Sequence, residues 1–256
     1  MNNIIITGAN HGIGYYLTLA LVEQGHCIQA IDLEVDHLEE MCTKYPHSLR
    51  ITQGDVTDKA RMLQIVRAFV EEHARINILI NNACLAIFKP FEEKTIDETK
   101  CEFDVNYFGY IHMIQTVLPF MKEEGYGIIH NFSSGVGITG FPRIYGYAST
   151  KAAIESLTRT LAIELAPYGI TVNMIQPPLC RTRSASPLGV PDSFLADPAE
   201  IGEKLSRKIG STKSTITPDL QTAIGLKMNQ LFPNAMGQFL ARMTEKAIRE
   251  AQEKEI

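Results

Sequence analysis

Short apolar runs alternate with amphipathic segments from the N-terminus to about residue 175. The first run, Ile4–Ile6, is followed by a helical pattern that Gly25 ends. Later apolar runs predict strands at Cys27–Ile31, Leu49–Thr52, Ile76–Ile80, Gly127–Phe132, Ile170–Ile175 and, at an edge, Lys213–Thr217. Helices are predicted at Asp58–His73, Asp97–Lys122, Tyr145–Ala166 and, with a break at Pro233, Gln221–Glu255.

Strands that are almost entirely apolar and alternate with helices indicate a parallel sheet covered on both faces. The predicted fold class is therefore α/β, a Rossmann-type doubly wound parallel sheet of about seven strands with helices on both faces. No linker-like or highly charged stretch divides the chain, so residues 1–256 are expected to form one domain. A variable substrate loop is expected near residues 183–212 and a helical tail over 219–256.

The composition argues against several classes of protein. A net charge of −5 without a basic stripe argues against nucleic acid binding. No apolar run approaches the length of a membrane span, and no secretory signal is found at the start. The five cysteines form neither a CxxC motif nor a Cys/His cluster, so no metal site is predicted. Interpreted as free thiols, they favour a cytoplasmic location.

A glycine-rich turn, Thr7–Gly14, follows the first strand and opens the first helix. A phosphate-binding turn requires this context, because glycine lets the backbone approach a pyrophosphate and a helix N-terminus presents N–H donors. The spacing is G-x-x-x-G-x-G and not the more common G-x-G-x-x-G. The residues predicted to bind the cofactor here are Gly8, Asn10, His11, Gly12, Ile13 and Gly14.

Asp32 ends the second predicted strand, at the distance from the turn where an acid accepts hydrogen bonds from an adenosine ribose. Its carboxylate would repel a 2′-phosphate, and no Arg or Lys follows it to bind one. His11, which precedes Gly12, is a poor substitute for such a cation while it is neutral. The predicted cofactor is therefore NAD, with NADP the less favoured alternative.

Tyr147 and Lys151 stand four residues apart, which places both side chains on one face of a helix. A phenol beside a fixed ammonium is expected to have its pKa drawn down toward neutrality, which suits a general acid or base. The spacing by itself is common in helices. It gains meaning here because the same chain carries a phosphate-binding turn.

Taken together, these motifs resemble the short-chain dehydrogenase/reductase family, of the classical type, from about Asn3 to Thr182. Thr7–Gly14 is similar to the family's T-G-x-x-x-G-x-G turn, and Tyr147–Lys151 to its Y-x-x-x-K. The resemblance implies further cofactor contacts: Asp55 and Val56 at the adenine, Asn82 and Ala83 in a segment like N-N-A-G, and Cys180 and Thr182 at the nicotinamide amide.

The resemblance also implies catalytic roles for four residues: Asn106, Ser134, Tyr147 and Lys151. Tyr147 would exchange a proton with the substrate oxygen, while Lys151 would lower the phenol pKa and bind the nicotinamide ribose. Ser134 lies thirteen positions before Tyr147, the family spacing, and would bind the substrate oxygen; Ser133 is the alternative. Asn106 would hold a water that connects Lys151 to solvent.

Two residues depart from the family pattern, since Cys84 and Pro178 replace glycines. A side chain at Cys84 could crowd the cofactor, and Pro178 fixes φ and removes an N–H donor. We therefore keep two alternatives beside an NAD(H)-dependent dehydrogenase of secondary alcohols: an NADP-linked carbonyl reductase and a non-catalytic dinucleotide-binding sensor. Substrate specificity is also expected from two earlier loops, Leu85–Phe91 and Gly135–Tyr145. Apolar residues in these loops and in the loop after Thr182 favour a small-molecule substrate that is an apolar alcohol or ketone: Phe88, Phe91, Ile138, Phe141 and Leu188. The resemblance implies a homodimer or homotetramer.

Overall fold

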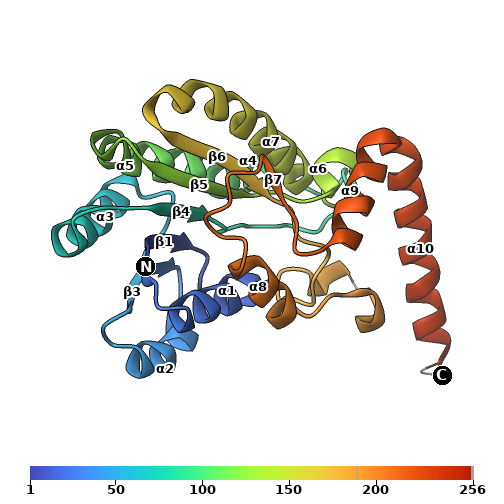
Figure 1. Cartoon of the computed structure of the whole chain (residues 1–256). Coiled ribbons are helices and arrows are strands. Elements are labelled where there is room, and N and C mark those ends of the chain that lie inside the picture. The colour runs from blue at the N-terminus through green and yellow to red at the C-terminus, as the bar shows by residue number, and fades with distance from the viewer. Residues whose placement is uncertain (189, 255–256) are drawn as a thin grey trace.

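A parallel sheet of seven strands forms the centre of the computed structural model, which describes residues 1–188 and 190–254 (Figure 1). The strands are β1 Asn3–Thr7, β2 Cys27–Asp32, β3 Leu49–Gln53, β4 Ile78–Asn81, β5 Gly127–Phe132, β6 Ile170–Ile175 and β7 Thr215–Ile216. Their order in the sheet is β3-β2-β1-β4-β5-β6-β7. Each neighbouring pair is parallel, which confirms the predicted fold class.

Helices connect the strands. The α-helices are α1 Gly12–Glu23, α2 Asp36–Lys44, α3 Lys59–His73, α4 Ile96–Phe103, α5 Gly109–Glu124, α6 Val136–Thr139, α7 Tyr145–Leu165, α8 Pro198–Ser206, α9 Leu220–Leu231 and α10 Pro233–Lys254. A π-helical segment, η1 Asp104–Phe108, joins α4 to α5, and short 3₁₀ turns lie at η2 Ala166–Tyr168, η3 Ser186–Leu188 and η4 Asp192–Phe194. Figure 1 shows α10 at the edge of the molecule, away from the sheet.

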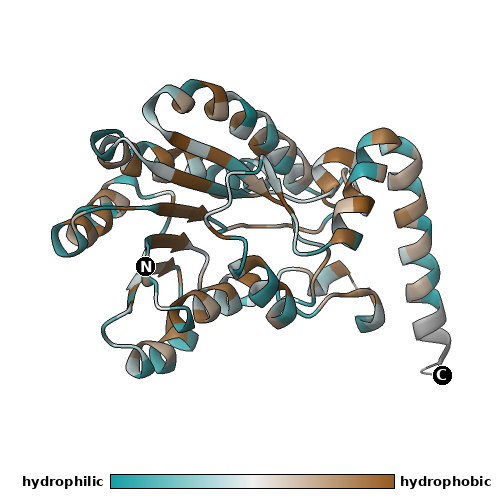
Figure 2. Cartoon of the chain, in the orientation of Figure 1, coloured by the Kyte–Doolittle hydropathy of each residue, from teal (hydrophilic) through white to brown (hydrophobic). Residues whose placement is uncertain are grey.

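Successive apolar residues of a strand point to opposite faces of the sheet, and two cores result. Ile4 and Ile6 lie in one core, which α1, α2 and α8 cover. Ile5, between them, lies in the other, which α3, α5 and α7 cover. The central strands are apolar along most of their length in Figure 2, as expected for a sheet buried on both faces. The doubly wound arrangement follows directly from this pattern.

Two features differ from the sequence expectations. The predicted helix Asp97–Lys122 is divided into α4, η1 and α5. The segment predicted as a loop at 183–212 contains α8, which packs against α1: a Cβ on Gly202 would lie 2.7 Å from the Cβ of Tyr16. The expected break at Pro233 is confirmed, because α9 ends at Leu231 and Pro233 begins α10. Position 189 of the expected loop and positions 255–256 of the expected tail lie outside the described residues.

The connections reverse direction between β1 and β4, because β2 and β3 lie on one side of β1 and the later strands on the other. In open α/β sheets, ligands bind at such a switch point, beyond the carboxyl ends of the strands. The loops after β1, β4 and β5 therefore define where to look for a site. Among the described residues, no helix has the length and apolar character needed to cross a bilayer.

Candidate active site

The glycine-rich turn after β1 is packed too closely for side chains. Gly8 has φ +68°, and a Cβ there would lie 2.6 Å from the Cα of Ala83. A Cβ on Gly14 would lie 2.0 Å from the carbonyl oxygen of Gly8. Asn82 fixes this turn from the end of β4, since its Nδ2 donates to the Gly8 carbonyl at 2.7 Å. The structure thus brings the turn together with Asn82 and Ala83.

The N-terminus of α1 is open to an anion. His11 occupies the N-cap position, yet its side chain makes no capping hydrogen bond. The first N–H groups of the helix, from Gly12 to Gly14, are therefore left without a side-chain acceptor, and a phosphate is the ligand that such a terminus favours. Thr182 lies beside this turn: a Cβ on Gly12 would lie 2.9 Å from its Cγ2. These residues fit a dinucleotide pyrophosphate.

Asp32 lies at the end of β2, next to the glycine turn. Its Oδ2 accepts a hydrogen bond from the Asn10 backbone N–H at 2.8 Å, and its Oδ1 accepts one from Leu33 at 2.7 Å. Each carboxylate oxygen keeps a free lone pair, so the group can still accept hydrogen bonds from a ribose. Asn10 in turn accepts from the backbone N–H groups of His37 and Leu38 and holds the start of α2 in place.

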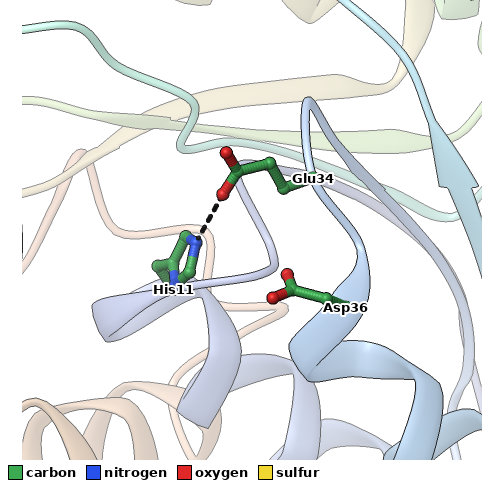
Figure 3. A group of neighbouring side chains, drawn as sticks. All are labelled: His11, Glu34 and Asp36. Carbon is green, nitrogen blue, oxygen red and sulfur yellow. Dashed lines mark hydrogen bonds and ion pairs between the residues drawn. The ribbon is translucent and has the colours of Figure 1, made fainter.

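A group of charged side chains surrounds this end of the site. Figure 3 shows His11 directed toward Glu34, with the Asp36 carboxylate nearby. The Nε2 of His11 lies 3.3 Å from Glu34 Oε2, and Arg183 reaches the same oxygen at 3.4 Å. The amide of Asn10 donates to Asp36 and lowers the pKa of that carboxyl. Three carboxylates, Asp32, Glu34 and Asp36, therefore lie at this end of the glycine turn, with His11 and Arg183 beside Glu34.

Tyr147 and Lys151 share one face of α7, with the Lys151 Nζ 5.4 Å from the centre of the Tyr147 ring. Lys151 is buried, and its Nζ donates to the Phe132 carbonyl at 2.9 Å. Desolvation raises the pKa of Tyr147 and lowers the pKa of Lys151. The prediction that this pair draws the phenol pKa toward neutrality is therefore wrong for this structure, because loss of hydration raises the pKa and outweighs the lowering effect of Ser134.

The hydroxyl groups of the two candidate serines, Ser133 and Ser134, have different neighbours in the structure. The Ser134 hydroxyl lies close enough to the Tyr147 phenol to lower its pKa, against the larger effect of desolvation. The Ser133 hydroxyl instead lies 3.3 Å from the Lys151 carbonyl and 3.3 Å from Glu155 Oε1. Ser133 is buried, and its hydroxyl is bound to residues of α7. Ser134 is therefore the serine nearer the phenol, and its role at a substrate oxygen stays a prediction.

Asn106 is fully buried in η1. Its amide binds both backbone groups of Leu85: Oδ1 accepts from the N–H at 2.7 Å and Nδ2 donates to the carbonyl at 2.8 Å. Nδ2 also lies 3.1 Å from Thr150 Oγ1 on α7. Asn106 thus joins the loop after β4 to the catalytic helix, and its role in holding a water stays a prediction. π-Helical turns are frequent at functional sites.

Three of the remaining cofactor candidates are partly or fully buried: Asp55, Val56 and Cys180. Asp55 follows β3, and its Oδ1 accepts from the Thr57 N–H at 2.8 Å. Val56 is buried, and a Cβ on Gly109 would lie 2.6 Å from its Cγ2. Cys180 is buried in the core beside α8, and this burial raises the pKa of its thiol to about 12. A redox role for Cys180 is disfavoured, because reactive cysteines have a low pKa and are accessible.

Cys84, which stands at a glycine position of the family pattern, is exposed. It lies close enough to Tyr147 to raise the pKa of the phenol further. Among the described non-glycine residues, positive φ angles occur at Ala74 and Arg143 only, so Cys84 is not held in a conformation that favours glycine. The backbone therefore accommodates a side chain at Cys84 without a positive φ.

Comparison with known proteins decides the family. The model described as short chain dehydrogenase matches residues 2–190, which is more than half of the chain. The chain belongs to the short chain dehydrogenase family. The resemblance carried by the glycine turn and the Tyr147–Lys151 motif is thus confirmed.

Several curated relatives are oxidoreductases by name. The chain is 34% identical over 177 residues to the uncharacterized oxidoreductase YusZ of Bacillus subtilis, covering 68% of this chain and 63% of that protein. It is 33% identical over 174 residues to a 3-ketodihydrosphingosine reductase of Bacteroides thetaiotaomicron, covering 68% and 62%. The match therefore spans less than two thirds of either relative. A 3-oxoacyl-[acyl-carrier-protein] reductase of Thermotoga maritima is 33% identical over 184 residues, covering 70% and 74%.

Solved structures of short chain dehydrogenases share the fold. A short-chain dehydrogenase from Streptomyces avermitilis superposes with a TM-score of 0.78 at 27% identity, covering 88% of this chain and 90% of that one. An NAD⁺-bound xylitol dehydrogenase superposes with a TM-score of 0.74 at 25% identity, covering 84% and 96%.

Two charged residues near the short chain dehydrogenase motifs were missed by the sequence reasoning. Lys94 and Glu102 form an ion pair whose side chains have no exposed surface. They lie beside Tyr145 and Gly146, at the first turn of α7. They are eight residues apart and match no known sequence motif, so the pair becomes visible only in the structure.

Proposed function

We propose that the chain is an NAD(H)-dependent oxidoreductase that transfers a hydride between the nicotinamide cofactor and a secondary alcohol or ketone. The observation that carries the proposal is one arrangement at the switch point of the sheet. The Tyr147 phenol lies near the Ser134 hydroxyl, and the buried Lys151 Nζ lies 5.4 Å from the centre of its ring. The uncapped N-terminus of α1 and the Asp32 carboxylate lie at the same edge.

The chain's own residues hold the substrate oxygen and move its proton. In reduction, Tyr147 donates its phenolic proton to the carbonyl oxygen, and in oxidation the phenolate accepts the hydroxyl proton. Ser134 donates a hydrogen bond to the same oxygen as negative charge develops there. Lys151 supplies a fixed positive charge beneath the phenol. When bound, the nicotinamide cofactor would supply the hydride-transfer chemistry.

Asp32 is expected to determine the preference for NADH over NADPH. Asp32→Ala should lower NADH affinity about tenfold, because hydrogen bonds to a charged group contribute about 1.5–3 kcal/mol. The same variant should bind NADPH better, since one of the three carboxylates near the ribose is removed. Fluorescence titration with both cofactors measures the ratio. Glu39→Gln, an exposed carboxylate further along α2, is the matched control; an unchanged ratio in Asp32→Ala would contradict the assignment.

An apolar substrate is the second part of the proposal. Phe91 is 76% exposed beside the site and packs against Tyr145 with ring centroids 5.0 Å apart. The other apolar residues of the predicted substrate loops are half-buried, namely Phe88, Ile138, Phe141 and Leu188. Two relatives are named as reductases of a ketosphingoid base and of a 3-oxoacyl chain, both ketones on an alkyl chain.

Ketone reduction with NADH should therefore become more efficient as the alkyl chain of a methyl ketone lengthens. Each buried methylene contributes about 0.8 kcal/mol, so kcat/KM should rise about fourfold per methylene until the pocket is filled. NADH oxidation followed at several chain lengths measures this. Polyhydroxylated ketones of equal length serve as the control. No turnover across the whole panel, with NADH bound, would favour the sensor alternative.

We also expect a homodimer or homotetramer in the cytoplasm. Phe108 in η1 and Ile163 on α7 expose large apolar side chains on the helices that would pair. Sedimentation of the purified protein tests the assembly.

A further inference from the structure

Lys94 and Glu102 are the buried charges of the site that the proposed chemistry does not use. Lys94 lies in the loop before α4, and Glu102 lies in the last turn of that helix. Neither side chain has exposed surface, and Lys94 Nζ pairs with Glu102 Oε2. Burying two charges costs free energy that their attraction regains only in part, so stability alone is a weak reason for such a pair.

The pair holds the middle of the loop that follows β4, Leu85–Phe91, which we call the substrate loop. Lys94 Nζ donates to the Ile87 carbonyl at 3.0 Å, and Glu102 Oε1 accepts from the Ile87 N–H at 2.8 Å. Both backbone groups of one loop residue are thus bound by the two members of one ion pair. Ile87 lies between Leu85, which Asn106 holds, and Phe91, which packs on Tyr145. The loop is therefore held at several points along its length, and the ion pair holds it at Ile87.

The same pair packs against the catalytic helix. A Cβ on Gly146 would lie 2.0 Å from Glu102 Oε2 and 2.9 Å from Lys94 Nζ, so the pair fits only because residue 146 is glycine. Lys94 Nζ also lies 5.0 Å from the centre of the ring of Tyr145, the residue that precedes Gly146. The residue that follows Gly146 is Tyr147. Glu102 is near enough for its charge to oppose the phenolate form of Tyr147.

We propose that Lys94 and Glu102 are positioning residues for the proposed reaction: the pair holds the substrate loop against the first turn of α7, and Lys94 offsets the negative charge that Glu102 would otherwise direct at the Tyr147 phenolate. The proposal rests on the proposed function, in which an alcohol gives its hydride to the nicotinamide and its proton to Tyr147. Lys94 and Glu102 touch neither reactant in this scheme.

Other groups also face the phenol, and the test has to leave them unchanged. The ionisable or polar side chains around Tyr147 are Cys84 after β4, Tyr110 on α5, Ser134 after β5, Lys151 on α7 and Glu102 on α4. Only Glu102 among them is ion-paired with a second buried residue. A change in Lys94 therefore alters the field at the phenol through Glu102 and leaves the remaining neighbours in place.

The pH profile of alcohol oxidation tests the electrostatic role. Lys94→Met leaves the Glu102 carboxylate without its cation, and this unpaired charge disfavours the Tyr147 phenolate. The midpoint of the pH profile of kcat should therefore rise by about one pH unit. Below that midpoint, kcat should fall about tenfold. Glu102→Gln should lower the same pH midpoint, because the positive charge of Lys94 then favours the Tyr147 phenolate without an opposing carboxylate. The double variant, Lys94→Met with Glu102→Gln, should restore the wild-type midpoint, a rescue that a purely structural role does not predict.

The matched control is the exposed pair on the same segment. Lys89 pairs with Glu98, nine residues away, and is 43% exposed. Lys89→Met should leave the midpoint where it is, because solvent screens this pair and it has no contact with Gly146. If Lys94→Met fails to fold, Glu102→Gln still decides the question. Unchanged midpoints in every variant that folds would overturn the electrostatic role.

Hydrogen exchange tests the holding role without turnover. The amide of Ile87 should exchange at least about tenfold faster in Lys94→Met than in Lys89→Met, since the variant removes the donor to the Ile87 carbonyl and leaves Glu102, the acceptor of the Ile87 N–H, without its cation. Equal exchange would overturn the holding role. If wild-type protein oxidises no alcohol while Ile87 exchange responds as expected, the proposed function fails and the loop clamp stands.

Discussion

Tyr147→Phe should lower the turnover number for ketone reduction by about 10²–10⁴-fold, the range that general acid catalysis supplies. The variant removes one hydroxyl and keeps the ring that packs over Lys151. NADH affinity should therefore change little, and the loss should appear in kcat. Stopped-flow measurement of NADH oxidation, with NADH binding measured separately by fluorescence, distinguishes the two effects.

Tyr145→Phe is the matched control for this result. Tyr145 lies two residues away on the same helix, and its hydroxyl lies 3.0 Å from Thr99 Oγ1, away from Ser134. Removing that hydroxyl should cost about 0.5–1.5 kcal/mol of stability and leave turnover within a few-fold of wild type. Equal losses in the two variants would show that the phenol of Tyr147 is not the proton donor.

Much of the sheet could be predicted from apolar runs alone. Gly127–Phe132 and Ile170–Ile175 have the same bounds in the structure as in the sequence prediction, because their residues are buried on both faces. Helix α8 was missed, since it is short and follows a Ser- and Pro-rich segment typical of a loop. The π-helical turn that carries Asn106 was also missed. Its hydrogen-bond pattern depends on packing against Leu85 and Thr150, which the local sequence does not show.

The spacing of motifs in the sequence was enough to locate the candidate site residues. It was not enough to predict the direction in which their pKa values shift. The thirteen-residue separation pointed to Ser134, and the structure places that hydroxyl near enough to Tyr147 to affect the phenol pKa. The direction of the phenol pKa was predicted wrongly, because the burial that raises it is not visible in a sequence. The Lys94–Glu102 pair was invisible for the same reason: two charged residues near a helix are normally solvated, and only the fold buries them.

Gly14→Ala should greatly weaken NADH binding and also destabilise the protein. The new Cβ would lie 2.0 Å from the Gly8 carbonyl oxygen and 2.7 Å from Asn82 Nδ2, so the glycine turn must move away from α1. Overpacking of this kind costs about 1–3 kcal/mol. The shifted turn misaligns the N–H groups at the start of α1, and NADH affinity should fall at least about tenfold. Thermal unfolding and fluorescence titration measure the two effects.

Gly225→Ala is the control that isolates the close contact from the change in helix propensity. Gly225 is also helical, in α9, but a Cβ there meets no atom within 4 Å. Alanine in an open helical position should stabilise the protein by about 0.5–1 kcal/mol and leave NADH binding unchanged. The two variants make the same chemical change, so opposite effects on stability follow from packing alone. If Gly14→Ala bound NADH as tightly as Gly225→Ala, the turn after β1 would not be the pyrophosphate site, and the assignment of the cofactor to the switch point between β1 and β4 would fail with it.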